Sequence, residues 1–398
     1  MLIMVFSENV AVKKYLLHDY KGREKLIIHS KKSTMENELY CLRKFSRNGT
    51  NPYSPDIIEV GTDYYVMKYY SVKLGARNNY RKLRGLRRIL FSISKEELFR
   101  QLDEIVDILK EEEIQHFDIH PANILFCEKD KHLKLIDFCC AKTDHIIPNR
   151  ITELVIREAK YGGDSGTVAM IKKYIDKALI PIEKQVEEVN GLLDIVGKKH
   201  FPGSSGLGKT YQKIDIPYFY DRPFHKDTSK EFNAIRSAIS IMPKSVIDVG
   251  CASGYTIFNL MRMFQLDSAI AYEADPNVFN FLVKIRKYFS LKEFELINKI
   301  SPDSEFKETD LVICMNVHMW LEKEFGRDDS NLIISNLIKN SKEMFFQTAG
   351  RESGGQYRVK WLKNKEIIKN YLHDMGGNEV TFIGTLKKRH LFKVTNVS

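Results

Sequence analysis

The sequence predicts a multidomain chain, in which a small bilobal α+β domain precedes an α/β domain with a parallel sheet. Its 398 residues exceed the roughly 100–200 that one domain usually takes. Gly, Ser and Pro are densest at residues 201–223, which indicates a linker. Beyond the linker, strand-like and helical patterns alternate, as in a parallel sheet with helices on both faces. We expect a first domain at 1–145, a helical extension and linker at 146–225, and a second domain at 226–398.

The composition, 43% hydrophobic and 29% charged, is that of a globular protein. No apolar run approaches the ~18 residues of a spanning helix, and the short run at residues 1–6 lacks the basic leader of a signal peptide. The six cysteines form no C-x-x-C pair, so reduced thiols in a cytoplasmic protein are the simplest expectation.

A basic stretch at residues 73–93 contributes to the net charge of +10. It contains four apolar residues near helical spacing, Leu83, Leu86, Leu90 and Ile93. Two interpretations remain open. The stretch is either a solvated face over a core seam or a contact for an anionic polymer or for the inner membrane surface.

In the first domain we place the boundary between an N-lobe and a C-lobe near residue 70. Two capping boxes of the form S-x-x-E, beginning at Ser33 and Ser94, predict the starts of two amphipathic helices. The expected helices are 33–45 and 94–115, and the expected strands are 9–15, 61–70 and 132–138. Residues 143–200 have a mostly helical pattern.

In the second domain, four largely apolar runs predict strands. These runs are 245–249, 269–273, 310–315 and 344–348. Helices are expected from Thr256, from Asn277 and at 330–339.

A loop with the composition of a phosphotransfer site joins the 94–115 helix to the next strand. It reads HFDIHPANIL and contains Asp118 and Asn123, and Asp137 follows in Ile-Asp-Phe. Phosphoryl transfer needs a carboxylate to accept a hydroxyl proton, and an Asn and a second Asp to hold metal ions. The loop resembles the protein-kinase superfamily, and its H-x-D-x-H-P-x-N order is most similar to small-molecule and lipopolysaccharide kinases.

The resemblance implies ATP and Mg²⁺ as cofactors. It implies that Asp118 is the catalytic base and that Asn123 and Asp137 bind the metal. Lys13 would contact the nucleotide phosphates, and Glu38 would be its ion-pair partner.

The resemblance further implies that the segment from Met67 through Tyr69 to Tyr70 is the hinge that receives adenine. The chain departs from the family pattern in three respects. No Gly-rich loop precedes Lys13, Cys139 replaces the Gly of D-F-G, and no A-P-E sequence follows. We therefore expect a minimal N-lobe and a non-protein substrate.

A glycine-rich turn follows the first strand expected in the second domain. Asp248, Gly250 and Gly254 form D-x-G-x-x-x-G, and Glu273 ends the next strand. Glycines here let a ligand approach the backbone, and an acid at that distance accepts ribose hydroxyls. Some other nucleotide remains an alternative ligand.

The pattern resembles class I methyltransferases, whose sheet is Rossmann-like. It implies S-adenosylmethionine bound over Asp248, Gly250, Cys251 and Gly254, with its ribose on Glu273.

The loop after the 310–315 strand, where such enzymes meet their acceptor, contains Asn316 and His318. It lacks the N-P-P-Y of amino-methyltransferases of nucleobases, so an oxygen acceptor is favoured. An anionic acceptor would be held by Arg222, His318 and Arg351. For His318, packing beside an apolar strand is an equal alternative.

Residues 203–210 satisfy the P-loop formula G-x-x-x-x-G-K-[ST]. Pro202 stands where a strand should precede this segment, and Pro217 interrupts the stretch where a helix should come after it. We interpret it as a connector.

The two patterns together predict a multifunctional transferase. The first domain would phosphorylate a hydroxyl acceptor, a glycan terminus or a small molecule, and the second would O-methylate the acceptor, with the new phosphate as one candidate for the methylated group. The chain resembles the kinase-methyltransferases of polysaccharide biosynthesis that end bacterial O-antigens, although there the methyltransferase comes first. Alternatives are an enzyme that modifies nucleic-acid ends and a methyltransferase on a nucleotide-binding pseudokinase scaffold.

Overall fold

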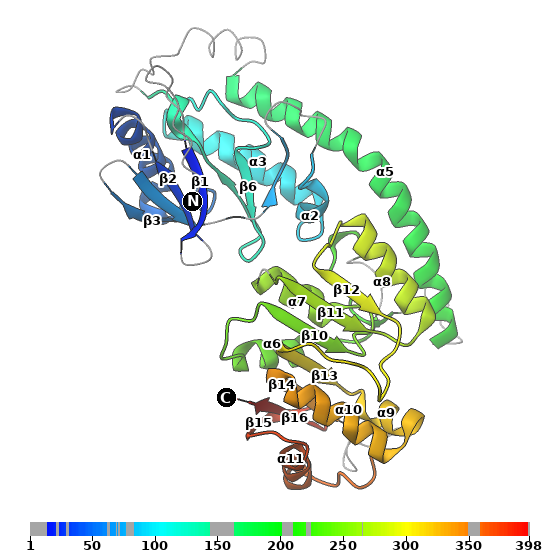
Figure 1. Cartoon of the computed structure of the whole chain (residues 1–398). Coiled ribbons are helices and arrows are strands. Elements are labelled where there is room, and N and C mark those ends of the chain that lie inside the picture. Colours follow the sequence, from blue (N-terminus) through cyan, green and yellow to red (C-terminus); the bar gives the residue numbers. More distant parts are fainter. Residues whose placement is uncertain are drawn as a thin grey trace. The chain divides into compact units, whose positions relative to one another are not determined.

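The computed structural model divides the chain into two compact units, Met1–Glu183 and Lys184–Ser398 (Figure 1). The long helix α5 (Gly163–His200) contains residues of both units, so their boundary lies within the helical extension expected at 146–225. The residues described are 14–20, 24–28, 32–61, 64–68, 70, 72–76, 83–143, 163–200, 210–219, 224–264, 266–348 and 359–396.

The first unit begins with an antiparallel sheet of order β1-β2-β4-β3 and one helix. Its elements are β1 (Lys14–Tyr20), β2 (Glu24–Ile28), α1 (Lys32–Ser46), β3 (Ile57–Val60) and β4 (Tyr64–Lys68). The apolar face expected on α1 is buried: Met35, Leu39, Leu42 and Phe45. The helix already includes Lys32, so Ser33 lies inside it and not at its N-cap, which corrects that expectation. A capping box locates a helix start only to within one or two residues.

The rest of this unit contains a second sheet, of order β5-β6-β7. Its elements are β5 (Val72–Lys73), α2 (Leu86–Leu90), α3 (Lys95–Glu111), β6 (Ile124–Cys127) and β7 (His132–Leu135). Helix α3 starts where the capping box predicts, because the Ser94 side chain accepts the backbone N–H of Glu97 at 3.1 Å. It ends at Glu111, before the expected residue 115, since Glu113 turns into the left-handed region at φ 52°.

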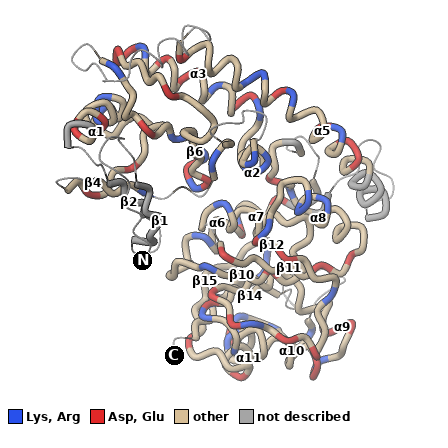
Figure 2. The backbone as a smooth tube through the Cα atoms, turned by 45° about the horizontal axis from the view of Figure 1, so that its top comes forward, with Lys and Arg blue, Asp and Glu red and all other residues tan. Residues whose placement is uncertain are grey.

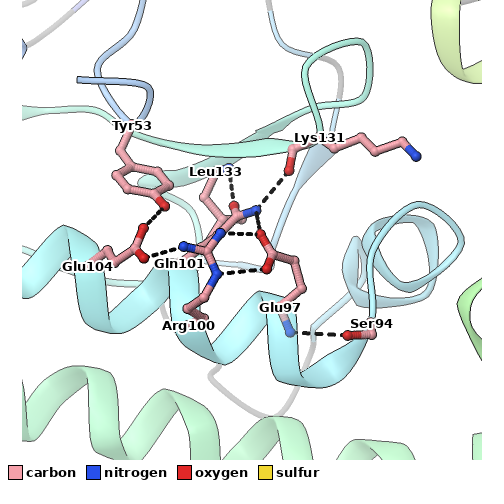
Figure 3. A network of polar contacts seen from close by, with 8 residues as sticks. All are labelled: Tyr53, Ser94, Glu97, Arg100, Gln101, Glu104, Lys131 and Leu133. Carbon is pink, nitrogen blue, oxygen red and sulfur yellow. Dashed lines mark hydrogen bonds and ion pairs between the residues drawn. The ribbon is translucent and has the colours of Figure 1, made fainter. Parts of the chain in front are cut away.

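Polar side chains fasten α3 to β7, as Figure 3 shows. The Gln101 amide accepts the backbone N–H of Leu133 at 2.8 Å and donates to the carbonyl of Lys131 at 2.9 Å. Tyr53 donates its hydroxyl to Glu104 on the same helix. These contacts fix the strand that leads to Asp137.

The described part of the basic stretch supports the core-seam interpretation. All four of its spaced apolar residues, Leu83, Leu86, Leu90 and Ile93, are at most 9% exposed. Such side chains are not available to enter a lipid surface, so we withdraw membrane contact through them. Blue and red residues both occur along α3 and α5 in Figure 2, so neither helix presents a single sign of charge.

The second unit is built on a seven-stranded sheet of order β12-β11-β10-β13-β14-β16-β15. Its strands are β10 (Ser245–Val249), β11 (Ser268–Tyr272), β12 (Phe294–Ile297), β13 (Thr309–Met315), β14 (Ser341–Thr348), β15 (Glu379–Leu386) and β16 (Arg389–Thr395). The first five pair in parallel, and β16 runs antiparallel to both of its neighbours. The expected α/β fold is confirmed. The expectation of a purely parallel sheet is corrected, because β15 and β16 form an antiparallel hairpin at one edge.

Helices cover both faces of this sheet (Figure 1). They are α6 (Ser229–Ala238), α7 (Tyr255–Phe264), α8 (Pro276–Tyr288), α9 (His318–Phe325), α10 (Arg327–Lys339) and α11 (Lys365–Asp374). Apolar residues of α9, α10 and α11 join strand residues in one core. Strand β12, helix α9 and the last hairpin were not expected from the sequence.

The segment expected to be a linker has regular structure in its described part. It contains β8 (Thr210–Gln212), the short helix η3 (Pro217–Phe219) and, just beyond, β9 (Phe224–Lys226). The glycines of the P-loop-like segment, within 201–209, lie outside the described residues. Among the residues that are described, no helix is long and apolar enough to cross a membrane.

Candidate active sites

The loop between α3 and β6 brings the three residues expected to serve phosphotransfer into one hydrogen-bonded arrangement. The Asn123 side chain donates to the carbonyl of Asp118 at 3.0 Å, and the Asn123 carbonyl accepts the N–H of Ile136 at 3.0 Å. Asp137 therefore directly follows Ile136, whose backbone is hydrogen-bonded to the loop. Asp118 and Asp137 are 4% and 9% exposed. His120 places Nε2 3.7 Å from Asp118 Oδ2.

Asp164, in the first turn of α5, supports this loop from outside it. Its carboxylate accepts the backbone N–H groups of His116 at 2.8 Å and Phe117 at 3.3 Å. The buried His116 ring contacts the carbonyl of Ile136 at 3.2 Å and packs edge-to-face on Phe138, with ring centroids 4.5 Å apart. Sequence reasoning missed Asp164, because an acid 47 residues beyond the loop gives no local signal.

The segment around Asp137 is held by α1. Asp137 has a left-handed backbone, φ 71°, and accepts the Cys139 thiol at 2.9 Å. The next residue, Phe138, donates its N–H to Glu38 Oε1 at 3.0 Å and packs on Phe45 at 5.1 Å. Glu38 thus contacts the segment of Asp137, which is expected to bind the metal, from the helix where the resemblance expects it.

Two residues expected at the nucleotide, Lys13 and Tyr69, lie outside the described residues. Met67 is on β4 and is 1% exposed. The described acids and amide suit Mg²⁺, because they offer the oxygen ligands that Mg²⁺ prefers and are held by the fold.

In the second unit, the turn after β10 depends on its glycines. Gly250 and Gly254 have φ 67° and 82°. A Cβ at Gly250 would lie 2.5 Å from a Val317 methyl, and one at Gly254 would lie 2.5 Å from the Phe258 ring. Any larger residue would meet these side chains and adopt a strained backbone, so the turn requires glycine twice.

Two carboxylates lie beside this turn. Glu273 accepts the N–H groups of Ala252 and Asp275, both at 2.8 Å. Asp248 is 3% exposed, and its Oδ2 has no hydrogen-bond partner in the described part of the chain. Burial first, and Glu273 second, raise the pKa of Asp248 to about 8.

This arrangement fits S-adenosylmethionine. The cofactor carries an ammonium group, which would neutralise Asp248, and ribose hydroxyls, which Glu273 would accept. Cys251 is buried, and burial and Asp248 raise the pKa of its thiol well above the ordinary value. Its part is therefore that of a neutral packing residue.

Asn316 stands at the carboxyl end of β13, in the left-handed region at φ 63°. Its side-chain amide donates to Gln347 Oε1 at 2.8 Å, and its N–H donates to the Gln347 carbonyl at 2.7 Å. Gln347 was not among the residues expected at the site. Neighbouring parallel strands have their carboxyl ends at the same edge of a sheet, and this rule could have identified Gln347.

His318 begins α9 and is fully buried. Its ring packs against Trp361 and Tyr371, and its Nε2 lies 3.1 Å from the Tyr371 hydroxyl. Burial, and then Arg327, lower its pKa to about 4. A neutral, enclosed ring does not bind an anion, so we withdraw His318 as a clamp in favour of the packing alternative. Arg222 and Arg351 lie outside the described residues.

No protein-family model and no curated protein matches the chain. Among solved structures, it is similar to the bifunctional kinase-methyltransferase WbdD, with 17% identity over 51% of this chain and 46% of that one and a TM-score of 0.41. Thus the match spans about half of the WbdD chain.

Two further structures are similar at the same level. The N-terminal domain of EvdMO1 with SAH bound has 12% identity over 51% of this chain and 94% of that one, with a TM-score of 0.37. An O-methyltransferase family protein from Burkholderia thailandensis has 13% identity over 43% and 56%, with a TM-score of 0.34. Similarity this low gives no information about what the present chain binds.

Proposed function

We propose that the chain is a bifunctional transferase. Its first unit phosphorylates a hydroxyl acceptor, a glycan terminus or a small molecule, and its second unit methylates an oxygen of that acceptor. The observation that carries the proposal is that each unit gathers the residues of one pattern at one place. Asp118 and Asn123 share a hydrogen-bonded loop, Asp137 directly follows Ile136, whose N–H donates to that loop, and Asp248 and Glu273 flank a turn that requires glycine.

In the first unit, Asp118 accepts the proton of the attacking hydroxyl, and Asn123 and Asp137 hold the metal. Mg²⁺, when bound, neutralises charge on the transferred phosphoryl group. The Asp164 carboxylate accepts two backbone N–H groups of the loop and keeps it in position before the substrates arrive, which reduces the reorganisation needed for phosphoryl transfer.

In the second unit, Asp248 and Glu273 hold the cofactor, and the edge formed by Asn316 and Gln347 receives the acceptor. S-adenosylmethionine supplies an activated methyl group when bound. If the acceptor oxygen belongs to a phosphate, it is largely ionised at neutral pH, with a second pKa of ~6, and needs no general base. Phosphorylation would then precede methylation.

The test supplies labelled ATP and labelled S-adenosylmethionine, separately and together, to a panel of glycans and RNAs. ATP label should enter a glycan or small acceptor, and Asp118→Asn should reduce this by a factor of about 10²–10⁴, the usual contribution of a general base. Asp107→Asn, on the exposed face of α3, is the matched control and should leave transfer unchanged.

Methyl incorporation should require both ATP and an intact Asp118. If methylation proceeds equally without ATP, the sequential order is wrong. If label enters only RNA ends, with the steep salt dependence of phosphate contacts, the nucleic-acid alternative replaces the glycan.

One contact favours a second candidate, a methyltransferase with a nucleotide-binding pseudokinase scaffold. Cys139 replaces the glycine of D-F-G, and its thiol donates to Asp137 Oδ1, an oxygen that a metal ion would need. Unchanged methylation and undetectable phosphorylation in both the wild type and Asp118→Asn would support this candidate.

A further inference from the structure

The carboxyl edge of the seven-stranded sheet contains an incompletely bonded amide pair. Asn316 directly follows β13, and Gln347 is the penultimate residue of the adjacent parallel strand β14; they are 8% and 0% exposed. A single side-chain hydrogen bond of 2.8 Å joins the two amides. Within the described residues, Asn316 Oδ1 and Gln347 Nε2 have no partner.

The chemistry of this pair does not depend on how the amide groups are oriented. Each amide has one accepting oxygen and one donating nitrogen, and the two ends are easily interchanged in a structure. Whichever nitrogen donates within the pair, the other nitrogen and the other oxygen stay free. The pair therefore always offers one donor and one acceptor.

Leaving these atoms without partners is costly. Buried polar groups are nearly always hydrogen-bonded, and the exceptions call for an unseen water or ligand. The left-handed backbone of Asn316, φ 63°, adds strain of the kind that concentrates at ligand sites.

The pair lies next to the glycine turn. Val317, the residue after Asn316, has a methyl group 2.5 Å from the position that a Cβ on Gly250 would take. Strand β13 also pairs directly with β10, which leads into that turn. A ligand group bound by the amides is therefore adjacent to the turn proposed to hold the methyl donor.

We infer that Asn316 and Gln347 bind a neutral hydroxyl group of a sugar in the methyl acceptor. A hydroxyl donates one hydrogen bond and accepts others, so it satisfies both free amide atoms. A phosphate dianion offers acceptors alone and would leave the free amide oxygen facing negative charge. The inference rests on the proposed methyltransferase function and narrows its acceptor: an unmodified hydroxyl is recognised beside the methylated oxygen.

The experiment measures saturation-transfer NMR from the full chain, loaded with S-adenosylhomocysteine, to a methyl hexopyranoside. The wild type should give a signal. Gln347→Met keeps the shape and removes the amide, and Asn316→Gly suits the left-handed backbone and removes the other amide. Each variant should bind the glycoside about tenfold more weakly, the upper range for loss of a neutral hydrogen bond. Gln185→Met on α5, which also removes a buried amide oxygen without a partner among the described residues, is the matched control and should retain the signal.

Calorimetry of S-adenosylhomocysteine with the wild type distinguishes a failure of the proposed function from a failure of the hydroxyl site. If the cofactor product does not bind, the proposed function fails. If it binds but the glycoside gives no signal, or an equal signal in the wild type and both variants, water alone occupies the amide pair and the inference is overturned. A signal from a hexose phosphate but not from the neutral glycoside would overturn it in favour of an anion site.

Discussion

The two candidate sites satisfy their polar groups in different ways. In the first unit, the loop is bonded to its own protein: the Asn123 amide donates within the loop, and Asp164 accepts two of its backbone N–H groups. In the second unit, polar atoms of Asp248, Asn316 and Gln347 are buried without a partner among the described residues.

The difference indicates what each site needs from its ligand. A loop held by protein contacts keeps its geometry without substrate, and ligand binding adds little to its stability. A site with buried, unsatisfied polar groups is destabilising by itself and gains when a ligand completes its hydrogen bonds. We therefore expect S-adenosylhomocysteine to raise the melting temperature of the second unit, and mutations at the two sites to act differently.

The largest effect should come from Gly250→Ala. The new Cβ would lie 2.5 Å from Val317 at φ 67°, so backbone strain and overpacking add. Each costs about 1–3 kcal/mol, and we expect a loss of about 2–6 kcal/mol in the free energy of unfolding, measured with urea, together with loss of S-adenosylhomocysteine binding. Gly384→Ala is the control, because nothing lies within 4 Å of its Cβ. Equal effects at both positions would contradict the close approach.

Asp248→Asn should separate stability from binding. A hydrogen bond to a charged group contributes about 1.5–3 kcal/mol, so affinity for S-adenosylhomocysteine should fall about 10- to 100-fold in calorimetry. The ligand-free protein should become more stable, because asparagine removes the cost of burying an ionisable carboxyl group, whether that cost comes from holding its proton or from burying its charge.

The pH dependence follows from the raised pKa of Asp248. Between its ordinary 3.8 and about 8, the folded protein keeps a proton that the unfolded chain releases. The contribution of this group to stability therefore falls as pH rises through that interval. The stabilisation by Asp248→Asn should be larger at pH 8.5 than at pH 5. An equal gain in the free energy of unfolding at both pH values would contradict a buried carboxyl group with a raised pKa.

The parts that sequence predicted well are those with a local cause. Strand β10 has the predicted bounds, because a β-branched run ends at a turn that only glycine permits. The same holds for the start of α3, where Ser94 caps the helix within its own first turn.

The parts that sequence missed depend on contacts between distant segments. Strand β16 inserts antiparallel between β14 and β15, which no local pattern specifies. The bond between Asn316 and Gln347 spans 31 positions, and only the parallel pairing of their strands brings them together. The choice between clamp and packing for His318 was open in the sequence for a related reason: its ring packs against Trp361 and Tyr371, which come much later in the chain and favour the packing alternative.

Asp164 shows the same limit at the first site, and its removal should have the smallest effect. Asp164→Ala leaves the N–H groups of His116 and Phe117 without their acceptor, so we expect a loss of about 1–2 kcal/mol in the free energy of unfolding by urea. Phosphotransfer should slow without a change in S-adenosylhomocysteine affinity. The control is Asp176→Ala on the same helix, which breaks a solvent-exposed pair with Lys95 and should cost well under about 1 kcal/mol. If the two substitutions cost the same, the loop does not depend on α5, and the contrast between a site held by protein contacts and a site completed by its ligand is lost.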